Sequence, residues 1–369
     1  MSRVLVGMSG GVDSSVAAAV LASAGHDVVG VSLQLYDHSG GGRASRCCSP
    51  EDFLDARRVA AQMGFPYYVV NREEQFGRRV LEYFVDEYRH GRTPNPCVRC
   101  NAEVKFETLV RLADWLGADS VATGHYARLE EDAAGDGRRL LRALDREKDQ
   151  SYFLFGLTQP QLRAARFPLG EMTKTHVRET AARLGLAGAS KPESQDICFV
   201  EGGDYRDFLR SRALEPEPAG QIVDGQGREL GVHAGLSDFT VGQRRGIGVS
   251  SSRRLYVLRV DSVTNQVVVG GRDDLLCDRI ELSEVRFVRP VAAMTSFEAT
   301  VRVRYRHEGA LATVSPGAGE TAVVSFRQPL MGVSPGQAAV FYDDDEVIGG
   351  GWIGPGARLE DVAALSESA

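Results

Sequence analysis

The chain of 369 residues is long enough for two or three domains, since one domain usually takes about 100–200 residues. Its composition is globular, with 43% hydrophobic and 25% charged residues, and no stretch approaches the roughly 18 unbroken apolar residues of a membrane helix. The N-terminus lacks the features of a signal peptide, so we expect a cytoplasmic protein with no membrane partner. The net charge of −7 argues only weakly against a nucleic-acid partner, because a basic face can coexist with an acidic remainder.

Strand and helix patterns alternate over the first two hundred residues. Short runs rich in Val predict strands, and amphipathic or Ala-rich stretches predict helices. In chain order we expect strands at 4–6, 28–33, 67–70 and 120–123, and helices at 13–24, 50–63, 73–90 and 102–116. This alternation predicts a Rossmann-like α/β fold, with a mainly parallel sheet covered by helices on both faces.

Beyond about residue 205 the pattern changes to short β runs divided by turn signals such as Ser315-Pro316-Gly317 and Ser334-Pro335-Gly336. Strands at this spacing are typical of a small barrel or sandwich. We therefore expect three domains. They are a catalytic α/β domain at 1–205, a small β-rich central domain at 206–275 and a C-terminal β-barrel at 276–369.

A glycine-rich segment, Gly7-Met8-Ser9-Gly10-Gly11-Val12-Asp13-Ser14, joins the first expected strand to the first expected helix. Glycines allow a sharp turn and close backbone approach to a ligand, and a helix N-terminus suits phosphate. Asp13 would repel phosphate unless a cation lay between them, so it is a candidate magnesium ligand. No Gly-Lys-Ser/Thr element follows, which excludes a kinase-type P-loop. The segment resembles the pyrophosphate loop of the ATP pyrophosphatases, although a serine-capped structural turn would use the same residue types.

Six cysteines are too few for a disulfide scaffold in a chain of this length, and clustered cysteines in a reducing compartment more often indicate metal binding or catalysis. Cys97 and Cys100 follow Pro94 and Pro96, which predict a stiff extended loop before the helix expected near Ala102. A helix N-terminus with nearby Arg99 and Lys105 would favour the thiolate of Cys100. Taken alone, Cys198 fits a core position equally well. We interpret Cys47-Cys48 as incidental or redox-sensitive and Cys277 as packing.

These segments, in this order, make the chain similar to the bacterial tRNA-specific 2-thiouridylases over nearly its whole length. The motifs that carry the resemblance are Gly-Met-Ser-Gly-Gly-Val-Asp-Ser at 7–14, Thr-Pro-Asn-Pro at 93–96, Cys100-Asn101, Glu-Val-Lys-Phe at 103–106, Ala-Thr-Gly-His-Tyr at 122–126, Lys-Asp-Gln-Ser-Tyr at 148–152, Ser-Gln-Asp-Ile-Cys-Phe at 194–199, Thr-Val-Gly-Gln-Arg at 240–244, Arg-Tyr-Arg at 304–306 and Pro-Gly-Gln-Ala at 335–338. Only the first motif and the cysteine pair are specific by themselves.

The resemblance implies a role for each matching position. Gly7, Met8, Ser9, Gly10, Gly11, Val12, Asp13 and Ser14 would bind ATP, with Leu33 and Gly124 as further nucleotide contacts. Asn95, Pro96 and Cys97 would face the target base. Cys100 would be the nucleophile, and Cys198 would carry a persulfide. The remaining tRNA contacts would be His125, Lys148, Asp149, Gln150, Arg304, Tyr305 and Gln337. The family also implies a sulfur-donor protein and tRNAs for Lys, Glu and Gln as partners, with the wobble uridine at position 34 converted to 2-thiouridine.

The sequence departs from the usual family pattern at Cys97, where many members carry Asp. The resulting three cysteines allow two mechanisms. In one, a Cys198 persulfide delivers sulfur to the adenylated base and Cys100 assists release by forming a disulfide. In the other, which we slightly favour, Cys97, Cys100 and Cys198 hold an iron–sulfur cluster that presents hydrosulfide.

Arginines gather in the C-terminal half at 244–245, 253–254 and 302–306. Arg302, Arg304 and Arg306 alternate at strand spacing, so we expect them on one face, where they would suit an RNA phosphate track or simply form a solvated surface. The Arg43–Arg46 segment is a candidate lid over RNA or a plain loop.

Two other classes of protein explain part of the sequence. An ATP pyrophosphatase acting on a small molecule accounts for residues 7–14 but leaves Cys97, Cys100 and Cys198 unused. A non-enzymatic redox or RNA-binding protein leaves the intact glycine-rich segment unexplained.

Overall fold

The computed structural model describes residues 1–36, 49–132, 135, 137–186, 197–200, 204–212, 216–289 and 295–356. The chain forms two compact units. The first comprises Met1–Leu81, Pro96–Asp204 and Asp345–Val347, and the second comprises Glu82–Asn95, Tyr205–Asp344 and Ile348–Ala369. The expected three-domain division at residues 205 and 275 stays a prediction.

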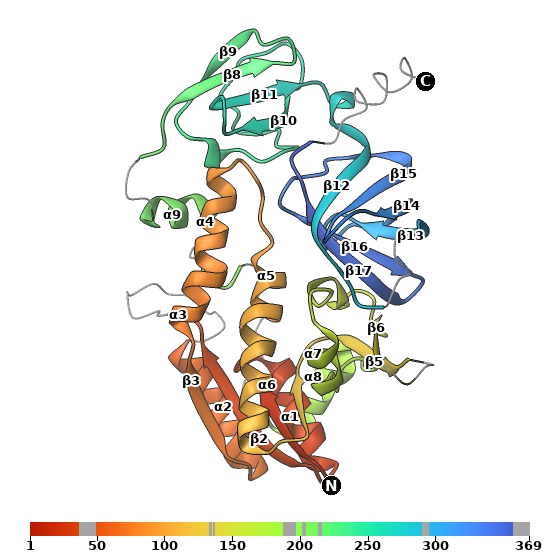
Figure 1. The fold of residues 1–369 in the computed structure, drawn as a ribbon. Helices are drawn as coiled ribbons and strands as arrows, with labels where there is room; N and C mark the ends of the chain where they lie inside the picture. Colours follow the sequence, from red (N-terminus) through yellow and green to blue (C-terminus); the bar gives the residue numbers. More distant parts are fainter. Residues whose placement is uncertain are drawn as a thin grey trace. The chain divides into compact units, whose positions relative to one another are not determined.

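The first unit is built on a parallel sheet with the strand order β3-β2-β1-β4-β7 (Figure 1). Its strands are β1 (Arg3–Gly7), β2 (Asp27–Gln34), β3 (Tyr67–Asn71), β4 (Ser120–Thr123) and β7 (Ala165–Arg166). All four expected strands are confirmed. Within the described residues the chain leaves β1 toward β2 and later returns to its other side as β4, so the direction of winding switches at β1.

Helices cover both faces of this sheet, as the sequence predicts. Val4 and Val6 of β1 pack in one apolar cluster with residues of α1 (Val12–Ser23), α2 (Pro50–Met63) and α8 (Lys174–Arg183). The side chain between them, Leu5, is buried outside this cluster, and α6 (Glu107–Leu116) contacts β1 and β4. The period-two alternation of β1 therefore feeds two separate cores.

Two long helical segments contain π-helical turns. One runs through α3 (Glu73–Phe76), η1 (Gly77–Leu81) and α4 (Glu82–Arg89). The other runs through α5 (Pro96–Arg99), η2 (Cys100–Phe106) and α6. The first matches the expected helix at 73–90. The second begins six residues before the expected start, and such π segments are frequent at functional sites.

The rest of the first unit connects these elements. It contains the antiparallel hairpin of β5 (Ala127–Glu131) and β6 (Arg138–Arg142), then η3 (Ser151–Phe153) and α7 (Gln159–Ala164). Residues 345–347 come from far along the chain and join this hairpin, where Glu346 pairs with Leu141.

The second unit is β-rich, as its turn-divided sequence predicts. Apart from α4 it has one further described α-helix, α9 (Tyr205–Arg212), and short 3-10 turns η5 (Leu236–Asp238) and η6 (Asp273–Leu275). A four-stranded sheet in the order β10-β11-β8-β9 combines β8 (Gly220–Asp224), β9 (Glu229–His233), β10 (Tyr256–Asp261) and β11 (Gln266–Gly270).

Six described strands form the C-terminal barrel in the order β12-β15-β14-β13-β16-β17, and pairing of β12 with β17 closes it. They are β12 (Leu276–Phe287), β13 (Phe297–Arg302), β14 (Ala310–Pro316), β15 (Ala322–Met331), β16 (Ala338–Asp343) and β17 (Glu346–Ile353). Closure removes the exposed strand edges that would otherwise invite association.

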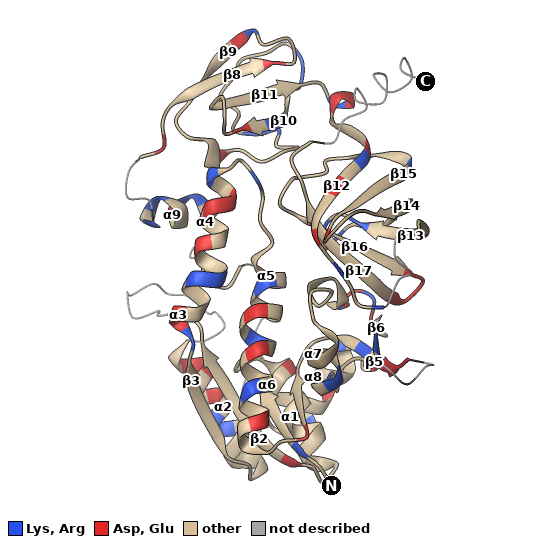
Figure 2. Ribbon diagram, in the orientation of Figure 1, with Lys and Arg blue, Asp and Glu red and all other residues tan. Residues whose placement is uncertain are grey.

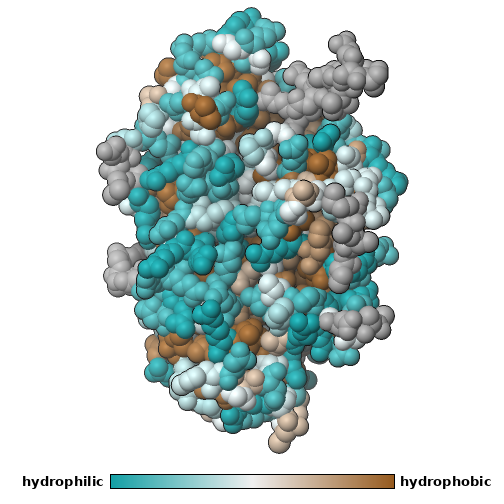
Figure 3. Space-filling model, in the orientation of Figure 1, coloured by the Kyte–Doolittle hydropathy of each residue, from teal (hydrophilic) through white to brown (hydrophobic). Residues whose placement is uncertain are grey.

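The visible surface is mainly hydrophilic, with apolar residues in small separate groups (Figure 3). No described helix is both long and apolar enough to cross a membrane. Both observations agree with the globular composition.

Candidate active site

The glycine-rich turn lies at the carboxyl edge of the parallel sheet, beside the switch point at β1. Ligands of open α/β sheets bind at this place. Gly10 has φ +74° there, and a Cβ would come within 2.4 Å of the Asp52 carbonyl oxygen. Gly11 precedes α1 in an extended conformation and gives the helix no side-chain cap. The first N–H groups of α1 are thus left to an external anion, which fits phosphate.

Gly124 follows β4 and lies directly against this turn. A Cβ at Gly124 would come within 2.6 Å of the Ser14 amide nitrogen, so only glycine allows this approach. Leu33 is buried in β2, two residues beyond Val31, which pairs with Gly7. The structure therefore brings the predicted nucleotide residues 7–14 and Gly124 together, with Leu33 on the neighbouring strand at the same edge.

Asp13 stands at the start of α1 between a lysine and a tyrosine. Lys174 Nζ donates to both carboxylate oxygens of Asp13, at 2.7 and 2.8 Å, and the Tyr126 hydroxyl donates to Oδ1 at 2.8 Å. The Lys174 side chain is only 9% exposed, whereas that of Asp13 is 32% exposed. The sequence predicted a magnesium ion next to Asp13. In the structure, the Lys174 ammonium supplies at least part of this positive charge.

Lys174 was not among the residues that the sequence singled out. It is the first residue of α8, where the positive end of the helix dipole disfavours a cation. Two carboxylates offset this cost, since Asp145 Oδ2 accepts a hydrogen bond from the Lys174 backbone N–H at 2.9 Å. The sequence could have shown that a lysine stands at the first position of a helix. It could not show the partners of this lysine, which lie 161 and 29 residues away.

The cysteine pair lies on a helix and not in the extended loop that the sequence predicts. α5 begins at Pro96, because proline has no N–H to lose and a preset φ at the first helical position. Cys97 is exposed in this first turn, and Cys100 is buried at the start of η2. Arg99 Nη1 is 3.0 Å from Glu103 Oε1, so its charge is largely matched within its own helix.

Cys198 lies on a segment that packs against the same part of the first unit. The ring of the next residue, Phe199, meets Phe76 of α3 edge-on, with centroids 5.7 Å apart. The neighbouring Gln75 donates from Nε2 to the Glu103 backbone carbonyl of η2 at 2.9 Å. The segments of Cys100 and Cys198 are therefore both packed on α3, although they are about a hundred residues apart.

The expected cluster site is not formed in the described part of the chain, which includes Cys97, Cys100 and Cys198. No group of three or more His, Cys, Asp or Glu side chains there could hold a metal ion. The three thiols are therefore not gathered as cluster ligands in that part of the chain, and the cluster stays a prediction.

Cys277 has no place in this site. Cys277 is buried in the barrel core, where burial raises its thiol pKa to about 11. This agrees with packing. Cys47, Cys48 and the Arg43–Arg46 segment lie outside the described residues, as do Ser194–Asp196.

Models of three protein domains match the chain in succession. They are a tRNA methyl transferase HUP domain at residues 2–202, a tRNA methyl transferase PRC-barrel domain at 206–271 and an aminomethyltransferase beta-barrel domain at 277–353. The tRNA-specific 2-thiouridylase MnmA of Geobacter metallireducens is 53% identical over 357 residues, which cover 95% of this chain and 96% of that protein. The chain belongs to the tRNA-specific 2-thiouridylase family. The proteins of the same name from Geotalea uraniireducens and Roseiflexus sp. are 50% and 47% identical, covering 95% and 96% of this chain and 94% and 99% of theirs.

The first unit carries six of the RNA contacts expected for a 2-thiouridylase. Pro96 and Cys97 begin α5, and His125 follows β4. His125 Nδ1 lies 2.8 Å from Thr123 Oγ1, and its ring lies beside Phe106 and Phe167. Burial of the ring, together with the nearby Lys105 ammonium, lowers the pKa of His125 to about 3. Any RNA contact of His125 would thus be made by a neutral imidazole.

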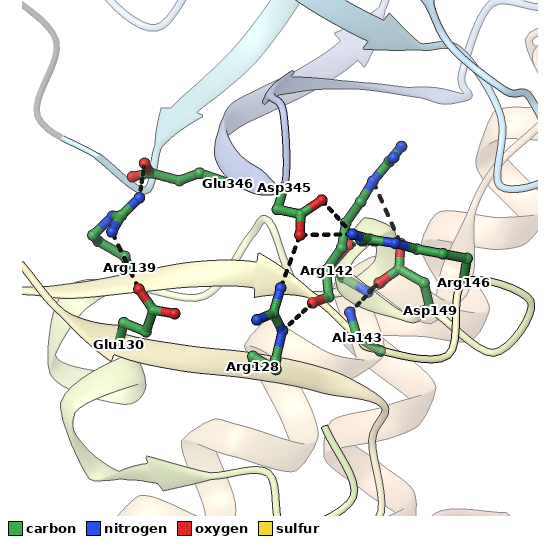
Figure 4. Close-up of polar contacts among 10 residues, drawn as sticks. Arg128, Glu130, Arg139, Arg142, Ala143, Arg146, Asp149, Asp345 and Glu346 are labelled. Carbon is green, nitrogen blue, oxygen red and sulfur yellow. Dashed lines mark hydrogen bonds and ion pairs between the residues drawn. The ribbon is translucent and has the colours of Figure 1, made fainter. Parts of the chain in front are cut away.

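The remaining three, Lys148, Asp149 and Gln150, occupy the segment between β6 and η3 (Figure 4). Asp149 is 4% exposed and accepts hydrogen bonds from the backbone N–H groups of Ala143 and Ser151. Gln150 Oε1 accepts from the Tyr126 backbone N–H at 3.0 Å. Asp149 and Gln150 thus shape this segment, while Lys148 is half-buried.

The second unit carries the other expected contacts of a 2-thiouridylase. Gln337 Nε2 donates to the carbonyl oxygens of Thr93 and Pro94, at 2.9 and 3.2 Å, and so fixes the chain that leads to the buried Asn95. Arg244, Arg245, Arg253 and Arg254 are exposed between η5 and β10. Acidic residues outnumber basic ones on α4 and on α6, so neither helix presents a continuous basic stripe (Figure 2).

The expected row of Arg302, Arg304 and Arg306 on one strand face is wrong. β13 ends at Arg302, and the next residues turn. The Arg302 guanidinium donates to the backbone carbonyls of Tyr305 and His307 inside this turn, and only Arg304 and Arg306 are exposed. Arg302 therefore uses its guanidinium to bind nearby backbone carbonyls and is not exposed as the other two arginines are.

We predict that His125 does not titrate between pH 8 and pH 5. Its folded-state pKa of about 3 lies below the ordinary value of 6.5, so the neutral ring contributes stability above about pH 6.5. That contribution is lost as the pH falls from 6.5 toward 3. An NMR pH titration should show one imidazole resonance that stays constant and disappears in His125→Gln. A midpoint between pH 6 and 7 for that resonance would contradict the burial.

Proposed function

We propose that the protein is a tRNA-uridine 2-sulfurtransferase, which uses ATP to convert the wobble uridine at position 34 of tRNA to 2-thiouridine. The observation that supports this most is the position of the open α1 N-terminus beside the Asp13–Lys174 pair, in the same unit as Cys100 and Cys198. A phosphate site and two thiols are the two chemical requirements of the reaction. The resemblance noted from the motifs and the named relatives point the same way.

Adenylation makes the uracil oxygen replaceable. The C2 oxygen of uridine attacks the α-phosphorus of ATP, pyrophosphate leaves, and C2 then carries AMP as a good leaving group. The glycine-rich turn and the first N–H groups of α1 would hold the phosphates, and Lys174 would offset charge on the departing pyrophosphate. Magnesium usually binds through one or two carboxylates and substrate phosphates, so the partly exposed Asp13 fits a shared Mg–ATP site.

Sulfur transfer would use Cys100 and Cys198, whose segments both pack against α3. The outer sulfur of a Cys198 persulfide attacks C2, and AMP leaves with the former uracil oxygen. The Cys100 thiolate then attacks the Cys198 sulfur, which forms a disulfide and releases the thiolated base. A thiol reductant restores both cysteines, and a sulfur-donor protein reloads Cys198. Cys97, exposed in the first turn of α5, would lie on the side of the base.

The proposal also covers how the tRNA is bound and which tRNAs are substrates. The target base must leave its stack, which costs a few kcal/mol. Pro96, Cys97, His125 and Lys148 of the first unit, and Asn95, Arg304, Tyr305 and Gln337 of the second, are the proposed contacts. We propose tRNAs for Lys, Glu and Gln as substrates, in the cytoplasm.

The function is tested by nucleoside mass spectrometry on unmodified tRNA after anaerobic incubation with the protein, ATP, magnesium and a persulfide donor, because sulfide alone cannot load Cys198 without an oxidant. We predict new 2-thiouridine, which disappears in Cys100→Ser and Cys198→Ser. Cys277→Ala removes a buried thiol of the second unit and is the matched control that should keep the product. A methylated nucleoside instead, as the names of two of the matching domains would suggest, would overturn the proposal. Pyrophosphate release that needs no tRNA would favour a small-molecule ATP pyrophosphatase.

Lys174→Met should lower tRNA-dependent pyrophosphate release by about 100-fold, the usual loss when one preorganised electrostatic partner is removed. The hydrophobic stem is kept, so the fold of α8 should persist. Arg178→Met, one turn along the same helix and exposed, removes an equal charge and should change the rate little. Equal rates for both variants would show that Lys174 is only a structural partner of Asp13.

A further inference from the structure

The segment between β6 and η3, residues 143–150, carries the expected RNA contact Lys148 but has no helix or strand of its own. Exposed connections of this kind are mobile unless their backbone groups are bonded. Its shape therefore depends on side chains that bind its backbone and its charges. Asp145 does this within the turn, where its Oδ1 accepts from the Glu147 N–H at 3.2 Å. Asp149 and Asp345 are two further carboxylates that do this (Figure 4).

Asp149 closes the segment from within. Its Oδ1 accepts from the backbone N–H groups of Ala143 and Ser151, at 3.2 and 3.1 Å, and its Oδ2 accepts from the Ser151 hydroxyl at 3.1 Å. Arg142 Nε lies 3.8 Å from the same carboxylate. These contacts join the first residue after β6 to the first residue of η3, so they fix the width of the segment. In its outer turn, 144–148, the Leu144 N–H donates to the Gly170 carbonyl and the Lys174 N–H donates to Asp145 Oδ2, both at 2.9 Å, but neither contact holds the Arg146 side chain.

Asp345 holds that outer turn from a distant part of the chain. Its carboxylate accepts from Arg146 Nη2, at 2.5 and 2.6 Å, and from Arg128 Nη2 at 2.9 Å. Its backbone carbonyl accepts from the Arg142 N–H at 2.8 Å. Arg128 also donates from Nε to the Arg142 carbonyl at 2.8 Å, so Asp345 binds β5, β6 and the outer turn together.

The Asp345 carboxylate offsets the positive charges of three neighbouring arginines. Arg128, Arg142 and Arg146 all act on its carboxylate, and hydrogen bonding from Arg146 contributes most to holding the Asp345 pKa below its usual range. Without the carboxylate, three guanidinium groups would repel one another at the base of the turn. Arg146 lies two residues from Lys148 in the same turn, so a shift of Arg146 would move Lys148 with it.

We propose that Asp345 is a positioning residue for tRNA binding, which acts through Arg146 to hold the turn that presents Lys148 to the RNA backbone. This proposal rests on the proposed function, because it takes Lys148 as an RNA contact. Lys148 sits in a hydrogen-bonded turn, with its N–H donating to the Asp145 carbonyl at 3.1 Å, so the position of Arg146 sets the direction of Lys148.

The test compares Asp345→Asn with Asp343→Asn, which removes the same charge two residues earlier. Asp343 pairs with Arg289 at 3.1 Å and belongs to the second unit, so it is the matched control. We expect Asp345→Asn to raise the KM for tRNA about tenfold, the scale of one lost charge-assisted contact, while kcat at saturating tRNA stays within about twofold. Asp343→Asn should leave both unchanged.

A second readout separates positioning from general destabilisation. Lys148→Ala should lower the slope of log K against log salt for tRNA binding by about 1, and Asp345→Asn should do the same. The double variant should bind no more weakly than Lys148→Ala alone, because both changes remove one interaction. Additive losses, or an unchanged salt slope in Asp345→Asn, would overturn the proposal. A wild-type protein that forms no 2-thiouridine would instead refute the proposed function itself.

Discussion

The ion pair between Asp13 and Lys174 sets where the other elements of the first unit can lie. Asp13 begins α1 directly after the glycine-rich turn, and Lys174 begins α8, so their 2.7 Å contact joins two helix N-termini that would otherwise repel each other. Tyr126 adds a third segment through its hydroxyl, and its backbone is bonded to Gln150. The phosphate site and the segment with the proposed RNA contact are therefore connected through one carboxylate.

Local sequence was sufficient for much of the fold. The strands at 4–6, 28–33, 67–70 and 120–123 follow from short apolar runs, and the parallel sheet follows from their alternation with helices. The glycine-rich turn was recognisable because glycine adopts the positive φ of Gly10 without strain and has no Cβ to meet the Asp52 carbonyl oxygen. The start of α5 at Pro96 was missed, since proline is compatible with both an extended loop and a first helical turn.

The candidate site was less predictable wherever a partner lies far along the chain. Residue types identified Asp13, Cys100 and Cys198. The importance of Lys174 and Asp345 depends on contacts with residues 161 and 199 positions away in the chain, which the sequence does not reveal. For Arg302 the prediction failed for the opposite reason. Its alternation with Arg304 predicted a shared exposed face, but Arg302 is bound by backbone carbonyls close to it in the chain. Spacing along the chain thus identified the chemical groups, whereas their neighbours decided which of them stay available.

The central claim is that ATP activates the C2 oxygen of the uridine before sulfur replaces it. The most direct measurement follows that oxygen, using tRNA that carries 18O at C2 of the wobble uridine in a single turnover with ATP and a persulfide donor. The account predicts that the label appears in the phosphate of AMP in an amount equal to the 2-thiouridine formed. Unlabelled AMP alongside thiolated tRNA would contradict adenylation and would require another route for the loss of the oxygen.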